Sequence, residues 1–251
     1  MTSNDPTASR PTYPQPGPSS PGKGVAHLWR IDVPVVLRTD EPHRYLSGAE
    51  QRRTARMGDP AVRARYQTVR VALRDVLGRY LAVPPHLVEL RTGAGGKPEI
   101  AHSPLRFSLS HSGRLGLLAV TWARDVGVDV ERPADGRDFG ALAARYFPEA
   151  EGRLVNSADP ADRAGIFLRL WTRKEACTKA AGGRMLGPGL RIPAAGSLAA
   201  GDGLVTHDPS WCAPGGVWTI RDVPAPVGYQ AALALAGPEP ARFILRRWEQ
   251  Q

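Results

Sequence analysis

Two carboxylates stand in one short apolar run, VGVDVE at residues 126–131. Side chains of a β-strand alternate between its two faces, so Asp129 and Glu131 share a side and lie about 7 Å apart at Cα. Like charges at this spacing repel unless a positive charge lies between them. Gly127 is on the same face and is expected to leave space for a ligand. The run suggests a cation site, and a solvent-facing strand with two ordinary acids is the competing interpretation.

A third acid, Glu175, lies in the segment FLRLWTRKEACTKAAGG. On a helix, Trp171, Glu175 and Lys179 share one face by i, i+4 spacing. Three carboxylate ligands favour Mg²⁺, with Mn²⁺ as the alternative, over zinc. Lys174 and Lys179 beside such an ion would hold phosphate oxygens as compact point charges. The competing interpretation is an ordinary Glu175–Lys179 ion pair beside a tryptophan that packs in the core.

The segment TGAGGKP, residues 92–98, resembles a phosphate-binding loop in composition. It is not a Walker A motif, because Pro98 follows Lys97 where that motif requires serine or threonine. On spacing alone, a flexible connecting loop is the favoured interpretation.

Hydroxyls and an imidazole gather in SLSHSG, where Ser110, His111 and Ser112 precede a turn. The chain has no G-x-S-x-G elbow around these serines, so nucleophilic serine catalysis is not expected. A lone histidine at a strand end is most often structural. These side chains become candidates for phosphate binding only in combination with the other segments.

Apolar periodicity and turn residues predict the elements that must position these side chains. A capping-box spacing, Ser47 followed by Glu50, marks a helix start, and glycines 182–183 fit a helix end. The elements expected along the chain are a strand from Val25, helices at 47–57 and 60–82, a strand at 86–90, a hairpin at 106–122, a strand at 126–131, helices at 139–154 and 160–181, and a buried strand at 229–236.

The composition is that of a globular protein, with 42% hydrophobic and 23% charged residues and a formal net charge of +9. No apolar run approaches the ~20 residues of a membrane span, and the N-terminus lacks the apolar region of a secretory signal. Two cysteines, Cys177 and Cys212, indicate a reducing cytoplasm rather than a disulfide scaffold. The basic surplus is nearly all arginine, because only Lys23, Lys97, Lys174 and Lys179 are lysines.

Four segments taken together resemble the 4′-phosphopantetheinyl transferase superfamily, surfactin-type (Sfp-like) branch. They are GKPEI at 96–100, FSLSHSG at 107–113, VGVDVE at 126–131 and LWTRKEACTKAAGG at 170–183. The family pattern is G-K-P, then F-N-x-S-H-S, then G-(I/V)-D-(I/V)-E, then W-(S/T)-x-K-E-(A/S)-x-x-K. One departure is Ser108, where the family often has asparagine. It should be tolerated because residue 108 lies away from the Leu109 and His111 face.

The resemblance implies a holo-acyl-carrier-protein synthase class of enzyme. Such an enzyme moves phosphopantetheine from coenzyme A to a serine of acyl or peptidyl carrier proteins and releases 3′,5′-ADP. It serves fatty acid, polyketide or nonribosomal peptide biosynthesis, and its carrier partners are acidic and transient. Arg132, Arg137 and Phe139 are expected contacts for a carrier.

The resemblance also implies roles for single residues. Asp129, Glu131 and Glu175 match the Mg²⁺-site acids, and either Glu175 or a water on the metal would be the general base. Glu175 and Lys179 are the expected catalytic residues. Contacts to coenzyme A are expected from Arg70, Lys97, Pro98, Ser110, His111, Lys174 and Lys179, and the arginines Arg52, Arg53 and Arg56 lie where the family has early basic contacts that cannot be assigned singly.

The expected fold is α+β, a monomer of two similar halves related by a pseudo-two-fold axis, each a small mainly antiparallel sheet packed with helices. The halves are residues 25–124 and 125–251, the active site lies between them, and residues 1–24 form a disordered Pro- and Ser-rich leader. Two rival functions remain. A nucleic-acid binder would fit the positive charge but lacks any recognition motif. A different Mg²⁺-dependent phosphoryl-transfer enzyme or nuclease would use the same acids.

Overall fold

The computed structural model describes residues 21–22, 24–33, 41–134, 136–183, 188–196, 202–207 and 216–249. Most of the predicted leader 1–24 lies outside the described residues, and so do Lys23 and Cys212. Cys177 is buried with a free thiol. Among the helices so described, none combines the length and the apolar character that crossing a bilayer requires.

The described chain contains strands and helices in mixed order, which confirms the α+β class. The helices are α1 (Gly48–Ala55), α2 (Pro60–Leu81), α3 (Phe139–Tyr146), α4 (Glu149–Ser157) and α5 (Pro160–Ala180). The strands are β1 (Val25–Asp32), β2 (Leu90–Thr92), β3 (Pro98–Ile100), β4 (Leu105–Ser112), β5 (Leu115–Trp122), β6 (Val126–Glu131), β7 (Asp202–His207), β8 (Gly216–Asp222), β9 (Gln230–Ala236) and β10 (Arg242–Arg247).

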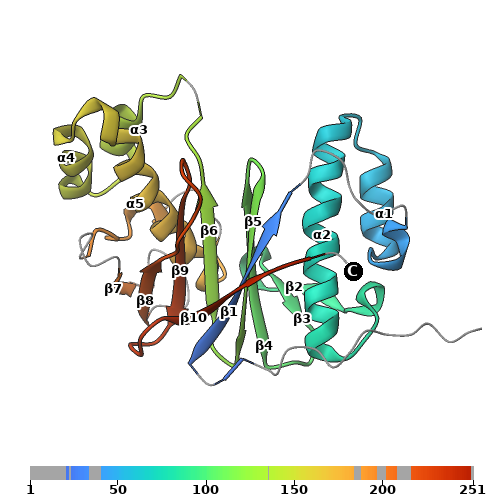
Figure 1. The fold of residues 1–251 in the computed structure, drawn as a ribbon. Helices are drawn as coiled ribbons and strands as arrows, with labels where there is room; N and C mark the ends of the chain where they lie inside the picture. The colour runs from blue at the N-terminus through green and yellow to red at the C-terminus, as the bar shows by residue number, and fades with distance from the viewer. Residues whose placement is uncertain are drawn as a thin grey trace, which may run out of the picture.

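Two four-stranded sheets pack face to face between the two long helices, α2 and α5, as Figure 1 shows. The first sheet has the order β10-β1-β5-β4, and the second has the order β6-β9-β8-β7. Strands β2 and β3 form a separate hairpin. Strand β10 pairs in parallel with β1, so the C-terminal strand joins the sheet that contains the N-terminal strand. The sequence did not predict that the last strand would pair with the first.

Alternation along the strands divides the core into layers. On β6 the three valines, Val126, Val128 and Val130, are fully buried against β5, β1 and β9. The opposite face of the first sheet packs on α2 through residues such as Trp29, Leu118 and Val120. Alanines of α5 and β9 fill the space between α5 and the second sheet. Helix α2, the two sheets and α5 are therefore successive layers.

The ends of the helices follow the expected capping chemistry. Ser47 and Glu50 form the predicted capping box at the start of α1. Gly182 follows the end of α5 with φ +77, and the amides of Gly182 and Gly183 donate to the carbonyls of Lys179 and Thr178. This is the Schellman pattern, which requires a left-handed residue and so favours glycine. The predicted glycine helix end is confirmed.

Two predicted elements are wrong. The helix expected over 139–154 is two helices, because Phe147 is extended, with ψ 162, before Pro148. A residue that precedes proline is disfavoured in the helical region. The strand expected over 86–90 is instead a 3₁₀ turn at Pro85–Leu87, and the strand begins only at Leu90. The carbonyls of Pro84 and Pro85 accept the amide hydrogen bonds of Leu87 and Val88, which form this turn.

Candidate active site

Helix α5 lies directly on β6 at Gly127. A Cβ placed on Gly127 would overlap the carbonyl oxygen of Ala176 and lie 2.5 Å from the backbone nitrogen of Ala180. The expectation that Gly127 leaves space for a ligand is therefore wrong, because helix backbone fills that space. The absence of a side chain instead lets α5 approach β6 closely enough to bring Glu175 and Lys179 to Asp129.

The serines of β4 face β6 with the period of a strand. The Ser110 hydroxyl donates to Oδ1 of Asp129 at 2.7 Å, and the Ser112 hydroxyl donates to Glu131 at 2.7 Å. Ser108 accepts a hydrogen bond from the amide of Val128 at 3.1 Å. Ser108 thus lies away from the Leu109 face, as predicted. The contact of Ser112 was not predicted, although the serine alternation in SLSHS was a signal for it.

Lys179 reaches across to Asp129 and completes this cluster. Its Nζ lies 2.6 Å from Oδ1 of Asp129 and 3.1 Å from the Ser110 hydroxyl. Asp129 is only 1% exposed, and its Oδ2 is buried without a hydrogen-bond partner among the residues that the structure describes. Buried carboxylate oxygens without partners are costly, so they indicate a missing cation or donor. We call Asp129, Glu131, Glu175 and Lys179 the acidic cluster.

The charges within the acidic cluster act on one another. Burial, with the negative charge of Asp129 and of Glu131, raises the pKa of Glu175 to about 8. Burial and the charge of Asp129 also raise the pKa of Glu131. A divalent cation beside these carboxyl groups would favour their ionised forms, which are the oxygen ligands that such an ion binds. As the side chains stand, no group of three or more acidic, histidine or cysteine residues in the described ranges is arranged to hold a metal ion.

A cavity of about 390 Å³ adjoins the C-terminal turn of α5. Its lining includes Lys97, Pro98, Phe107 and residues 180–183, which directly follow Lys179. The Lys97 ammonium donates to the carbonyl of Val126 at 2.9 Å, and burial lowers the pKa of Lys97 to about 8. The segment GKP is therefore a wall of a cavity at the C-terminal end of α5 rather than only a connecting loop.

Two further predicted residues lie outside the acidic cluster. His111 is exposed and lies on the face of β4 opposite Ser110. The Arg70 guanidinium pairs with Glu50, which also binds Arg74. The structure does not bring Arg70 to the acidic cluster, and its observed contact joins α1 to α2.

Lys174 is buried and pairs with a carboxylate outside the acidic cluster. It is 0% exposed, forms an ion pair with Glu151 of α4, donates to the carbonyl of Ile192 and lies 4.8 Å from the ring centroid of Phe147. This placement corrects the expectation that Lys174 holds phosphate oxygens, because its ammonium is enclosed on the side of α5 that faces α4. Trp171 packs among the aromatic rings of the same region, so its core interpretation is confirmed.

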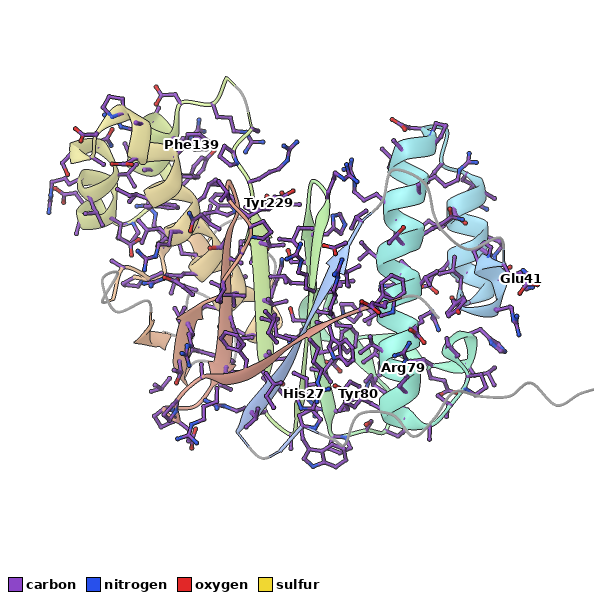
Figure 2. All side chains as sticks on the ribbon, in the orientation of Figure 1. His27, Glu41, Arg79, Tyr80, Phe139 and Tyr229 are labelled. Atoms are coloured by element: carbon purple, nitrogen blue, oxygen red, sulfur yellow. The ribbon has the colours of Figure 1, made fainter. Side chains whose placement is uncertain are left out.

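Tyr229 joins the two sheets near the acidic cluster. Its hydroxyl accepts a hydrogen bond from the amide of Arg114 at 3.1 Å, across 115 residues of sequence. Figure 2 shows Tyr229 at the upper end of the second sheet, and Arg114 follows Ser112 by two residues. This contact was missed because nothing in the spacing of two distant residues signals it.

Comparisons with known proteins agree with the resemblance drawn from the motifs. The family description "4′-phosphopantetheinyl transferase superfamily" matches residues 125–202. The 4′-phosphopantetheinyl transferase HetI of Nostoc is 38% identical over 167 residues, which cover 62% of this chain and 68% of HetI.

Two other relatives are similar over shorter stretches. The 4′-phosphopantetheinyl transferase AcpT of Salmonella typhimurium is 38% identical over 116 residues, 45% of this chain and 58% of AcpT. The 4′-phosphopantetheinyl transferase gsp of Aneurinibacillus migulanus is 30% identical over 138 residues, 51% of this chain and 54% of gsp. The chain thus spans a little more than half of these two relatives. It belongs to the 4′-phosphopantetheinyl transferase superfamily and is an enzyme of the phosphopantetheinyl-transferring class.

Proposed function

We propose that the protein transfers phosphopantetheine from coenzyme A to a serine of an acyl or peptidyl carrier protein and releases 3′,5′-ADP. The observation that carries the proposal is the acidic cluster itself, in which three carboxylates and Lys179 meet beside the β4 serines. The membership in the superfamily supplies the substrate pair. In the reaction, the serine Oγ forms a bond to the pantetheine-bearing phosphorus, and the bond from that phosphorus to the bridging oxygen breaks.

Asp129, Glu131 and Glu175 would hold Mg²⁺, with Mn²⁺ as a substitute. When bound, the metal would neutralise charge on the phosphoryl oxygens. Lys179 would bind pyrophosphate oxygens, because its ammonium lies beside the carboxylates that would hold the metal. Ser110 orients Asp129 through their hydrogen bond. Glu175 would accept the proton of the carrier serine.

Lys97 and Pro98 would contact coenzyme A from the cavity beside residues 180–183. His111 would contact it from the outer face of β4. The carrier would approach the exposed arginines Arg132 and Arg137, whose charge complements an acidic partner. Phe139 is a weaker candidate for this contact, because its ring packs 5.2 Å from that of Phe167.

We further infer that residues 25–124 and 125–251 are two related halves of a monomer, with the active site between them. In support, Ser110 and Ser112 come from the first sheet, whereas Asp129 and Glu131 come from the second.

The test is to incubate the protein with coenzyme A, Mg²⁺ and a panel of apo-carrier proteins and to weigh the carriers by mass spectrometry. A gain of one phosphopantetheine identifies both the activity and its range. Asp129→Ala should abolish the Mg²⁺-dependent gain, and loading at normal Mg²⁺ by this variant would refute the metal role of Asp129. Binding of random DNA in a salt-sensitive gel shift, without carrier loading, would instead favour a nucleic-acid binder.

Glu175→Gln is expected to bind coenzyme A but to lose transfer, by about 10²–10⁴-fold if Glu175 is the general base. The amide keeps the size of the side chain but cannot accept the serine proton. Calorimetry with coenzyme A and the carrier mass assay measure the two effects separately. Unchanged turnover would remove Glu175 from the role of base.

Coenzyme A binding is expected to weaken as the pH rises through about 8, because the Lys97 ammonium has a pKa lowered to about 8 by burial and loses its charge there. Below that pH the charged form is present and attracts phosphate. In Lys97→Met, affinity should be lower at pH 7, and this pH step should be absent. Calorimetric titrations between pH 6.5 and 9.5 compare the two proteins, with buffers matched in ionic strength. Identical pH profiles would exclude Lys97 from the phosphate contact.

A further inference from the structure

Lys179 occupies the place that a cation would take in the acidic cluster. Its ammonium lies 2.6 Å from Oδ1 of Asp129, and the negative charges of Glu175 and Glu131 also act on it. The ammonium further donates to the Ser110 hydroxyl at 3.1 Å. These contacts fix Lys179 among the same oxygens that are proposed as metal ligands.

The pairing with Lys179 leaves the cluster incompletely compensated. Oδ2 of Asp129 is buried and has no hydrogen-bond partner in the described residues. One positive charge, the Lys179 ammonium, faces the three carboxyl groups of the cluster. The donor set therefore has an oxygen and negative charge to spare for a second cation, provided that Lys179 gives way.

A divalent ion and an ammonium cannot share Asp129 without strong repulsion, because two positive charges would lie within a few ångströms in a buried site. Lysine has a long flexible stem and can exchange one anion for another without movement of the helix. A pyrophosphate group is such an alternative anion. It would draw the Lys179 ammonium away from Asp129 while it adds oxygen ligands of its own.

We propose that Lys179 is a resident counter-cation that keeps Mg²⁺ out of the acidic cluster until the pyrophosphate of coenzyme A takes over its ammonium. This inference rests on the proposed function. It makes metal binding dependent on coenzyme A, so that the metal enters with coenzyme A or after it. The Lys179 ammonium keeps divalent ions of the solvent from binding the acids, and it preserves the positions of these acids in the free enzyme.

The proposal is tested by titrating Mg²⁺ into the 251-residue chain without coenzyme A, by calorimetry and by thermal unfolding. Lys179→Met should bind Mg²⁺ more tightly than the wild type by about tenfold or more. Its unfolding temperature should rise with Mg²⁺, whereas that of the wild type should respond weakly. Lys179→Gln, which keeps a hydrogen-bond donor for Ser110, should behave in the same way and guards against a failure of the methionine variant to fold.

Two control variants test whether the gain in Mg²⁺ affinity is specific to Lys179 and depends on Asp129. Arg114→Met removes a positive charge near Ser112 that has no described ion pair with the acids, and it should leave Mg²⁺ affinity unchanged. Adding Asp129→Asn to Lys179→Met should abolish the gained affinity. Equal or weaker Mg²⁺ binding by both lysine variants would overturn the proposal, as would tight binding that survives Asp129→Asn. Failure of the wild type to load any carrier with coenzyme A and Mg²⁺ would instead overturn the proposed function, a result independent of these titrations.

Discussion

Gly127→Ala is expected to lower phosphopantetheine transfer by about 10²-fold, because a displacement of about 1 Å at reacting groups has an effect of that size. The new methyl group would overlap the Ala176 carbonyl and press on the amide of Ala180, which are helix backbone and cannot rotate away. Helix α5 must then move from β6. The 2.6 Å contact between Lys179 and Asp129 would lengthen, and Glu175 would move with the helix.

The same substitution should also destabilise the fold by about 1–3 kcal/mol, the usual cost of overpacking. Thermal unfolding and the carrier mass assay measure the two effects. Gly165→Ala is a matched control in α5, because within the described part of the chain, its own helix apart, an added Cβ would meet only a Gln230 side-chain nitrogen 4.0 Å away. There alanine should leave transfer intact and favour the helix. Wild-type turnover by Gly127→Ala would mean that close packing of α5 on β6 is unnecessary.

Much of the fold could be predicted because local pattern and tertiary contact agree. The apolar stripe of α2, the alternating residues of β4 and β6, and the capping signals around α1 and α5 are all reproduced. In β6 both faces are buried, so its 2-residue period separates the valines that pack on the first sheet from the residues that meet α5 and the serines of β4. The helix over 139–154 failed because a single proline outweighed an apolar pattern that continues through it.

The acids of the acidic cluster were predictable from the sequence, but the sequence did not distinguish Lys179, which joins them, from Lys174, which does not. Asp129 and Glu131 follow from strand alternation, and Lys179 follows Glu175 by one helical turn. Lys174 carries the same charge in the same motif, and the spacing alone does not say which side of α5 meets the sheet. The glycine at 127 decides it, since Ala176 and Ala180 are the residues that pack on β6. Contacts of that kind depend on tertiary packing.

Lys174→Met is expected to destabilise the protein by about 3–5 kcal/mol, the usual cost of removing one partner from a buried ion pair. Glu151 is 3% exposed and would keep a buried charge after the loss of the ammonium. Glu151 also accepts hydrogen bonds from the amides of Ala194 and Ala195 at 2.6 and 2.7 Å, so it cannot turn to solvent without releasing that segment. Thermal and denaturant unfolding give the change in the free energy of unfolding.

An exposed ion pair on α4, the helix that carries Glu151, provides a comparison for the buried pair. Glu149 and Arg153 of α4 form an ion pair with side chains that are 85% and 67% exposed. Arg153→Met should change the free energy of unfolding by less than about 1 kcal/mol, because exposed pairs contribute little. A loss as small in Lys174→Met would contradict the buried pair between Lys174 and Glu151.

The double variant Lys174→Met with Glu151→Gln distinguishes two roles for Lys174, as the ion-pair partner of Glu151 or as a ligand of coenzyme A phosphates. If Lys174 acts through Glu151, the double variant should lose much less stability than the sum of the single variants, because no charge is then left unpaired in the interior. Coenzyme A affinity per folded molecule should stay close to that of the wild type in all three proteins. A phosphate ligand would behave in the opposite way: Lys174→Met would weaken coenzyme A binding at unchanged stability, and the second substitution would restore nothing. Calorimetry with coenzyme A below the unfolding temperature of each variant distinguishes these results, since Lys97→Met provides the expected loss for a lysine in the cavity wall.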